Sequence, residues 1–142
     1  MPHLNIEYSA NLEEVLDVQA LVERIHETAL ETGIFPLGGV RTRAEARNYY
    51  RIANGDPRAG YVHMMVRIGS GRDVETRRAA GERIFSALCD FMDELYQSRP
   101  LALSFELHEI PPDMAWRKNN LHECSRRNRL NEPRDHARDC VG

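Results

Sequence analysis

Residues 61–68 have the sequence Tyr-Val-His-Met-Met-Val-Arg-Ile, in which every second side chain from Val62 onward is apolar. Side chains on a strand alternate between its two faces, so Val62, Met64 and Val66 would share one face. His63 would lie on the opposite face, where we expect a packed, hydrogen-bonded histidine. The pattern predicts a strand with one buried face.

A glycine-rich turn and a long helix are predicted to follow this strand. Residues 69–71 read Gly-Ser-Gly, and Asp73 is a predicted N-cap because a carboxylate can accept hydrogen bonds from the first turn of a helix. The helix is expected to end before Pro100. Residues 101–108 alternate again and predict another strand. The apolar stripe of the helix is formed by Ile84, Leu88, Phe91, Met92 and Leu95.

The N-terminal part of the chain shows the same order of patterns. Residues 3–8, His-Leu-Asn-Ile-Glu-Tyr, alternate and predict a strand. Asn11 is the predicted N-cap of the next helix, with Glu13 and Glu14 in its first turn, where carboxylates are favoured. Gly33 stands where that helix is expected to stop.

These patterns predict an α/β (α+β) fold made of two βαβ units, offset by about 60 residues as judged from the starts of the strands. Long strand–helix–strand connections favour parallel pairing within each unit, and the helices would cover one face of a mixed sheet. Residues 40–51 could form either a strand or a short helix. The uncovered face of the sheet is expected to be apolar and to be covered by oligomerisation.

Composition sets limits on location and on partners. The 142 residues carry a formal net charge of −3, which gives no reason to expect nucleic acid or an anionic membrane as a partner. The chain begins with no secretory signal pattern, and Cys89, Cys124 and Cys140 are odd in number, so reduced thiols in a cytoplasmic protein are expected.

Residues 1–124 are predicted to form one domain. Residues 125–142 are predicted to be a solvated, disordered tail, with a partner- or anion-binding arm as the alternative.

Pro2 is a candidate general base. It directly precedes a predicted strand, so its nitrogen would be held by rigid structure. Methionine before proline is readily removed, which would leave a secondary amine with a usable lone pair. With Met1 retained, the same nitrogen is a tertiary amide and cannot act as a base. Taken alone, the proline is simply the residue before a strand.

Further informative blocks of sequence are residues 2–3, 32–37, 41, 62–64, 68–72, 101–106 and 119–122. Taken in this order, they resemble the 5-carboxymethyl-2-hydroxymuconate isomerase family of the tautomerase superfamily. The resemblance implies a trimeric protein that binds no metal or organic cofactor. It also implies that Pro2 carries a proton between two carbons of the substrate, and that Arg41 and Arg72 hold its carboxylates or polarise its oxygens. The implied substrate is a dienol with several carboxylates from aromatic (homoprotocatechuate) catabolism, which is converted to its conjugated keto isomer.

The physical chemistry of arginine is consistent with these roles. A base works best when its pKa lies near the working pH, and an arginine about 5 Å away disfavours a protonated amine by roughly 3 kcal/mol at an effective dielectric of about 20. Without the resemblance, Arg41 would be part of a solvated, arginine-rich stretch, whereas Arg72 lies near a helix N-terminus that favours anions. Glu106 is expected to pair with an arginine. Trp116 and Asn119 are candidates for covering the pocket.

Two alternatives remain open from the sequence. One is another enzyme of the same superfamily that acts on a different enol or unsaturated acid. The other is a non-catalytic trimeric binding module in which Pro2 is incidental.

Overall fold

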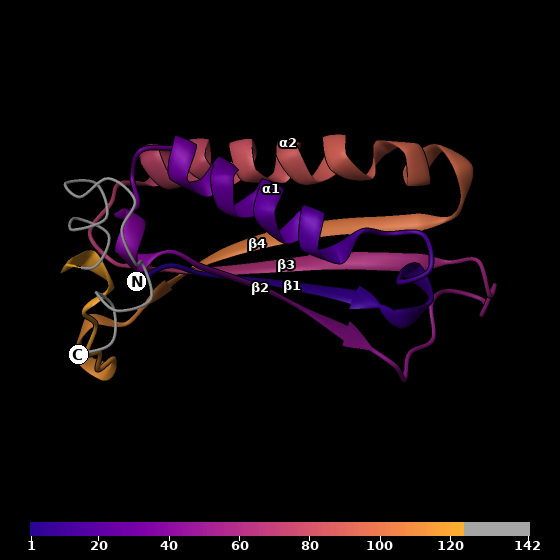
Figure 1. Cartoon of the computed structure of the whole chain (residues 1–142), viewed down its shortest axis with the longest axis horizontal. Coiled ribbons are helices and arrows are strands. Elements are labelled where there is room, and N and C mark those ends of the chain that lie inside the picture. The colour runs from indigo at the N-terminus through magenta and orange to yellow at the C-terminus, as the bar shows by residue number, and fades with distance from the viewer. Residues whose placement is uncertain (124–142) are drawn as a thin grey trace, which may run out of the picture.

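The computed structural model describes residues 1–123, in which two long helices cover one face of a four-stranded sheet (Figure 1). Two short 3₁₀ helices lie in the connections between these elements, and a third follows the last strand. The elements in chain order are β1 (His3–Ser9), η1 (Ala10–Leu12), α1 (Val18–Glu31), η2 (Leu37–Gly39), β2 (Arg41–Arg47), β3 (Gly60–Gly69), α2 (Val74–Ser98), β4 (Leu101–Ile110) and η3 (Pro112–Met114).

The sheet has the strand order β2-β1-β3-β4. β1 pairs with β2 in parallel, β3 pairs with β4 in parallel, and β1 and β3 are antiparallel. The predicted pair of βαβ units in a mixed sheet is therefore confirmed. The segment that the sequence left open, residues 40–51, contains strand β2, which is held by its pairing with β1.

The core lies between the sheet and the helices. Leu4 and Ile6 of β1 and Val62 and Met64 of β3 are buried on the helical side, as the alternating patterns predict. Burial of an aliphatic side chain of this size contributes about 1.5–3 kcal/mol to the free energy of unfolding. The helices contribute further fully buried side chains, namely Leu21, Ile25, Ile84, Leu88 and Met92.

The open face of the sheet is polar, so the expectation that it is apolar was wrong. Glu7 accepts a hydrogen bond from the Tyr61 hydroxyl at 2.7 Å, and the pKa of Glu7 is lowered mainly by that bond. His63 lies within 2.7 Å of the Ser104 hydroxyl. The uncovered face is therefore stabilised by hydrogen bonds and ion pairs, and burial of apolar surface does not explain why it would be covered.

Glu106 on this face pairs with histidines, not with the arginine that was expected. Its Oε1 lies 3.6 Å from His63 Nε2 and 3.4 Å from His108 Nε2. The register of the parallel strands β3 and β4 explains the difference, because it places Ser104 opposite His63 and Glu106 opposite Met65.

The predicted start of the first helix was also wrong. Asp17, not Asn11, is the N-cap of α1, and its Oδ1 accepts a hydrogen bond from the backbone N–H of Ala20 at 3.0 Å. Asn11 instead donates through its side chain to the carbonyl oxygens of Pro57 and Ala59. These long-range contacts fix a short 3₁₀ turn where the local sequence resembles a helix start.

The predicted ends of the other elements are correct. Asp73 caps α2, with Oδ1 accepting from Thr76 N–H at 2.7 Å, and the pKa of Asp73 is lowered chiefly by that backbone bond. Gly33 follows α1 with a φ of +76°, a left-handed conformation that glycine adopts without strain. No helix in residues 1–123 has both the length and the apolar character needed to cross a membrane.

Only one of the three cysteines falls in the described part. Cys89 is a half-buried free thiol whose pKa is raised by burial, which favours its protonated form. Cys124, Cys140 and the predicted tail of residues 125–142 lie outside the described residues. The division at residue 124 stays a prediction.

Replacing Asp17 with Ala tests the revised helix start. We expect Asp17→Ala to lower the free energy of unfolding by about 1 kcal/mol, because a first-turn N–H loses its acceptor. Urea denaturation followed by circular dichroism measures the change. Asp17→Asn keeps a side-chain oxygen and should lose much less. Equal stability of wild type and Asp17→Ala would contradict the assignment.

Candidate active site

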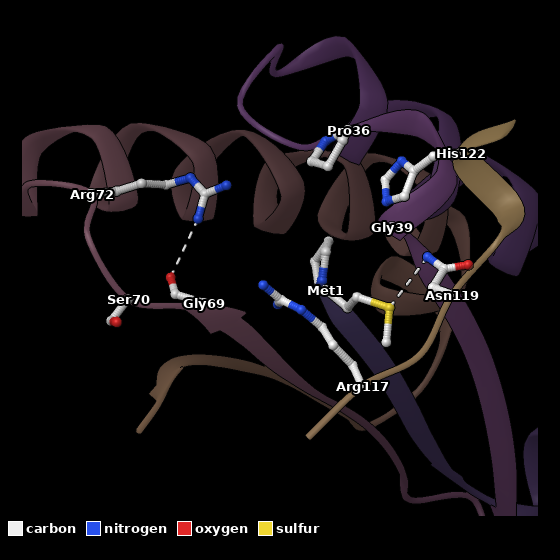
Figure 2. Close-up of a pocket in the computed structure, with 10 residues that line it drawn as sticks. Met1, Pro36, Gly39, Gly69, Ser70, Arg72, Arg117, Asn119 and His122 are labelled. Carbon is white, nitrogen blue, oxygen red and sulfur yellow. Dashed lines mark hydrogen bonds between the residues drawn. The ribbon is translucent and has the colours of Figure 1, made fainter. Parts of the chain in front are cut away.

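A pocket of about 520 Å³ lies at the end of the sheet where the chain begins. Four separate segments form it: the residues before β1, the loop that contains η2, the turn between β3 and α2, and the segment after β4 (Figure 2). Its lining residues are Met1, Pro2, Pro36, Gly39, Gly69, Ser70, Arg72, Arg117, Asn119 and His122.

Pro2 is buried and held in a fixed position at the start of β1. Its carbonyl oxygen accepts a hydrogen bond from the backbone N–H of Arg41 at 3.1 Å. Its ring lies beside Gly39, where an added Cβ would make an ordinary van der Waals contact of 3.5 Å with Pro2 Cδ. The expectation of a rigidly held proline therefore agrees with its surroundings, and the residue lines the pocket.

Met1 occupies the space in front of Pro2. Its sulfur accepts a hydrogen bond from Arg41 Nη1 at 2.8 Å and lies 3.5 Å from Asn119 Nδ2. Met1 also lines a neighbouring cavity of about 290 Å³. The residue therefore stands between two cavities and engages side chains that could otherwise bind a ligand.

Arg72 is fixed by backbone oxygens. Its Nη2 donates to the Ile34 carbonyl at 2.8 Å and its Nη1 to the Gly69 carbonyl at 3.3 Å, while the guanidinium lies 5.3 Å from the centre of the Phe35 ring. A cation over an aromatic face is favourable, and the remaining N–H groups stay available to a ligand. The structure thus brings Arg72 and Pro2 into one pocket.

Arg41 lies at the border of this pocket and does not line it. Its Nη1 contacts the Met1 sulfur and also the Gly39 carbonyl oxygen at 3.3 Å. The parallel pairing of β1 and β2 explains its place, because Arg41 lies opposite His3, one residue after Pro2.

Arg117 is the charged residue of the site that sequence reasoning missed. It lines the pocket together with Arg72, and Figure 2 shows its side chain reaching toward Met1 from the C-terminal segment. His122 also lines the pocket and was not singled out individually. The only signal for either was the block at residues 119–122, which includes His122 and follows Arg117 closely. Of the residues expected to cover the pocket, Asn119 does line it, whereas Trp116 is 86% exposed and lines the neighbouring cavity.

The electrostatic field at this end of the chain favours a neutral amine. The pKa of the Met1 amine is lowered first by burial and then by the charges of Arg117, Arg72 and Arg41. Both causes disfavour a positive charge. Such a field equally favours an anion, for which a guanidinium offers two parallel N–H donors. Within residues 1–123, no three His, Cys, Asp or Glu side chains are grouped to hold a metal ion.

Comparison with known proteins gives the family. The family model described as 5-carboxymethyl-2-hydroxymuconate isomerase matches residues 2–125. The chain belongs to this family. It is 39% identical over 122 residues to 5-carboxymethyl-2-hydroxymuconate Delta-isomerase of Escherichia coli, which covers 86% of this chain and 97% of that protein. The family and the isomerase class predicted from the sequence are therefore confirmed.

Solved structures agree with this membership. A 5-carboxymethyl-2-hydroxymuconate isomerase from Deinococcus radiodurans R1 superposes with a TM-score of 0.81 and 35% identity, covering 86% of this chain and 92% of that chain. A protein described as a fused 4-OT wild type symmetric trimer matches with a TM-score of 0.57 and 15% identity, over 82% of this chain and 93% of that chain. At that identity the second match shows a shared fold alone.

A saturated tricarboxylate tests the anion-binding character of the pocket. We expect tricarballylate to bind at low ionic strength and to be weakened by added salt, because the attraction is between charges. Arg72→Ala should weaken binding about tenfold or more, the scale of one charge-assisted hydrogen bond. Isothermal titration calorimetry measures both effects.

Arg78→Ala is the matched control, since Arg78 is exposed on α2 and pairs with Glu75 at 3.0 Å. It should bind as tightly as wild type. An unchanged dissociation constant in a folded Arg72→Ala protein would contradict the assigned role.

Proposed function

We propose that the protein isomerises 5-carboxymethyl-2-hydroxymuconate to its keto form, with the amine of Pro2 as general base once Met1 has been removed. The observation that carries this proposal is the convergence of three guanidinium groups on the end of the chain next to a buried Pro2. The 39% identity to an Escherichia coli protein named for this reaction supports the substrate.

Pro2 has the chemistry that the reaction needs. A free secondary amine takes a proton from one position of the substrate and returns it to a carbon further along the conjugated chain. The double bonds shift accordingly, and no atom is gained or lost overall. Because Pro2 is buried beside the same arginines, we expect the pKa of its amine to be lowered as that of the Met1 amine is. A base catalyses proton transfer best when its pKa lies near the working pH.

Arg72 and Arg41 would serve the substrate's negative charges. Arg72 is held by two carbonyl oxygens and so presents its other N–H groups in a fixed direction. Arg41 would be released from the Met1 sulfur when Met1 leaves. Each guanidinium also stabilises the negative charge that grows on the enolate oxygen during proton transfer.

A homotrimer in the cytoplasm remains part of the proposal. In the described chain, β2 and β4 each lie at an edge of the sheet with one side unpaired. Unpaired edges are commonly covered by another chain. Met114, Trp116 and Tyr49 are more than two-thirds exposed, which also favours an assembly that covers them.

Blocking the amine tests the role of Pro2. A variant with a short extension before Met1 keeps the Pro2 nitrogen in an amide, so it has no lone pair to accept a proton. We expect its turnover to fall by about 10²-fold or more, the usual contribution of a general base. The ultraviolet band of the dienol reports the rate, and mass spectrometry verifies the mature N-terminus of the reference protein. Equal rates would exclude Pro2 as the base, whereas a reference protein that does not accelerate the reaction would reject the substrate.

The pH dependence of kcat/KM tests the cause of the lowered pKa. Only the neutral amine is active, so kcat/KM should rise with pH through the pKa of the amine and level off above it. Arg41→Ala removes a positive charge, which should raise that pKa and move the rising limb to higher pH. His122→Asn is the control, because His122 is another titratable group of the pocket. The assignment of this rising limb to the Pro2 amine would be contradicted if Arg41→Ala left the limb at the same pH. It would also be contradicted if the limb disappeared in His122→Asn.

A further inference from the structure

We propose that Arg117 binds the carboxymethyl carboxylate of the substrate and makes the site selective for a branched tricarboxylate over a linear dicarboxylate. This inference rests on the proposed function and deepens it. It assigns to the segment after β4 a task in substrate recognition that neither Pro2 nor Arg72 performs.

The three guanidiniums at the pocket share one feature. Among residues 1–123, no carboxylate forms an ion pair with Arg41, Arg72 or Arg117. Arg41 donates to the Met1 sulfur and the Gly39 carbonyl, and Arg72 donates to two backbone carbonyl oxygens. By contrast, Arg77 pairs with Glu109 at 3.2 Å. Three like charges collected without a partner are unfavourable unless an anion binds between them. The site therefore suits a ligand with several negative charges.

The number of charges matches the substrate. Muconate is a diacid, and the carboxymethyl substituent adds a third carboxylate, so the dienol is a trianion near neutral pH. A pair of arginines leaves one of its carboxylates without a cationic partner. Arg117 supplies the third guanidinium and reaches the pocket from a different segment than Arg72 does (Figure 2).

The shape of the cavities assigns the branch to Arg117. Arg117 and Met1 line both the main pocket and the neighbouring cavity of about 290 Å³, which is bounded further by Pro111 and Trp116. Removal of Met1 would join the two spaces. The conjugated chain would then lie beside Pro2 and Arg72, with the substituent directed into the second space. Arg117 stands at the junction, where it can reach the carboxylate of the branch.

Close packing against η2 fixes residues 119–122, which follow Arg117 closely in the chain. Asn119 Nδ2 donates to the Gly38 carbonyl at 3.0 Å, and Asn119 Oδ1 accepts from Leu121 N–H at 2.7 Å. A Cβ on Gly38 would lie 2.7 Å from the backbone nitrogen of His122. Only glycine lets the two backbones approach this closely. Gly38 is therefore a positioning residue for Arg117, although it contacts no substrate.

A pair of substrates separates recognition of the branch from catalysis. The ratio of kcat/KM for 5-carboxymethyl-2-hydroxymuconate to kcat/KM for 2-hydroxymuconate, which lacks the substituent, measures selectivity. Both values of kcat/KM are measured at a pH above the pKa of the Pro2 amine, where kcat/KM no longer changes with pH. We expect Arg117→Ala to lower this ratio by about 10- to 100-fold, the effect of one lost charge-assisted contact. A change in the reactivity of the Pro2 amine alters kcat/KM for both substrates alike, so it does not alter the ratio.

Two further variants complete the test. Lys118→Ala removes the adjacent exposed charge and should leave the ratio at the wild-type value. Gly38→Ala should lower the ratio as Arg117→Ala does, because it displaces the segment. A ratio that Arg117→Ala leaves unchanged in a wild type that turns over the tricarboxylate would overturn this inference and leave the proposed function standing. A wild type that accelerates neither substrate would overturn both.

Discussion

The repulsion between the half-buried amine at the start of the chain and three nearby guanidinium groups is the interaction on which the proposed site depends. Burial lowers the pKa of the amine at the start of the chain, and Arg117, Arg72 and Arg41 lower it further. In the proposed mechanism, the same charges that keep the base neutral attract an anionic substrate. Binding of the substrate would relieve their mutual repulsion, so the cost of assembling the positive charge would be offset when the enzyme is loaded. One electrostatic arrangement thus serves both proton transfer and recognition.

The sheet topology brings these groups together. β1 and β2 are parallel, so Pro2 and Arg41, at their beginnings, lie at the same end of the sheet. β3 is antiparallel to β1, and β4 is parallel to β3, so both of these strands finish at that end. The turn that carries Arg72 follows β3, and the segment that carries Arg117 follows β4. The mixed order of the strands is therefore what concentrates the charge.

The regular elements could be predicted from the sequence where apolar periodicity decides the structure. The strands at residues 3–8, 61–68 and 101–108 and the Asp73 cap are of this kind. β2 could not be assigned, because Arg-Thr-Arg-Ala-Glu-Ala-Arg contains no large apolar side chain and depends on pairing with β1. The start of α1 was misjudged because Asn11 is engaged by residues more than forty positions away. Arg117 lies in a segment without periodicity, and only the docking of that segment on Gly38 brings it to the pocket.

The pKa of the Pro2 amine itself is the most direct test of the central claim. Nitrogen-15 NMR of protein labelled at proline, with Met1 removed, follows the titration of this one nitrogen without any substrate. The account predicts a titration below the range of an ordinary α-amino group, about 7.7–8.0. A pKa at or above that range would show that burial and the arginines do not hold the amine neutral, and would contradict the account.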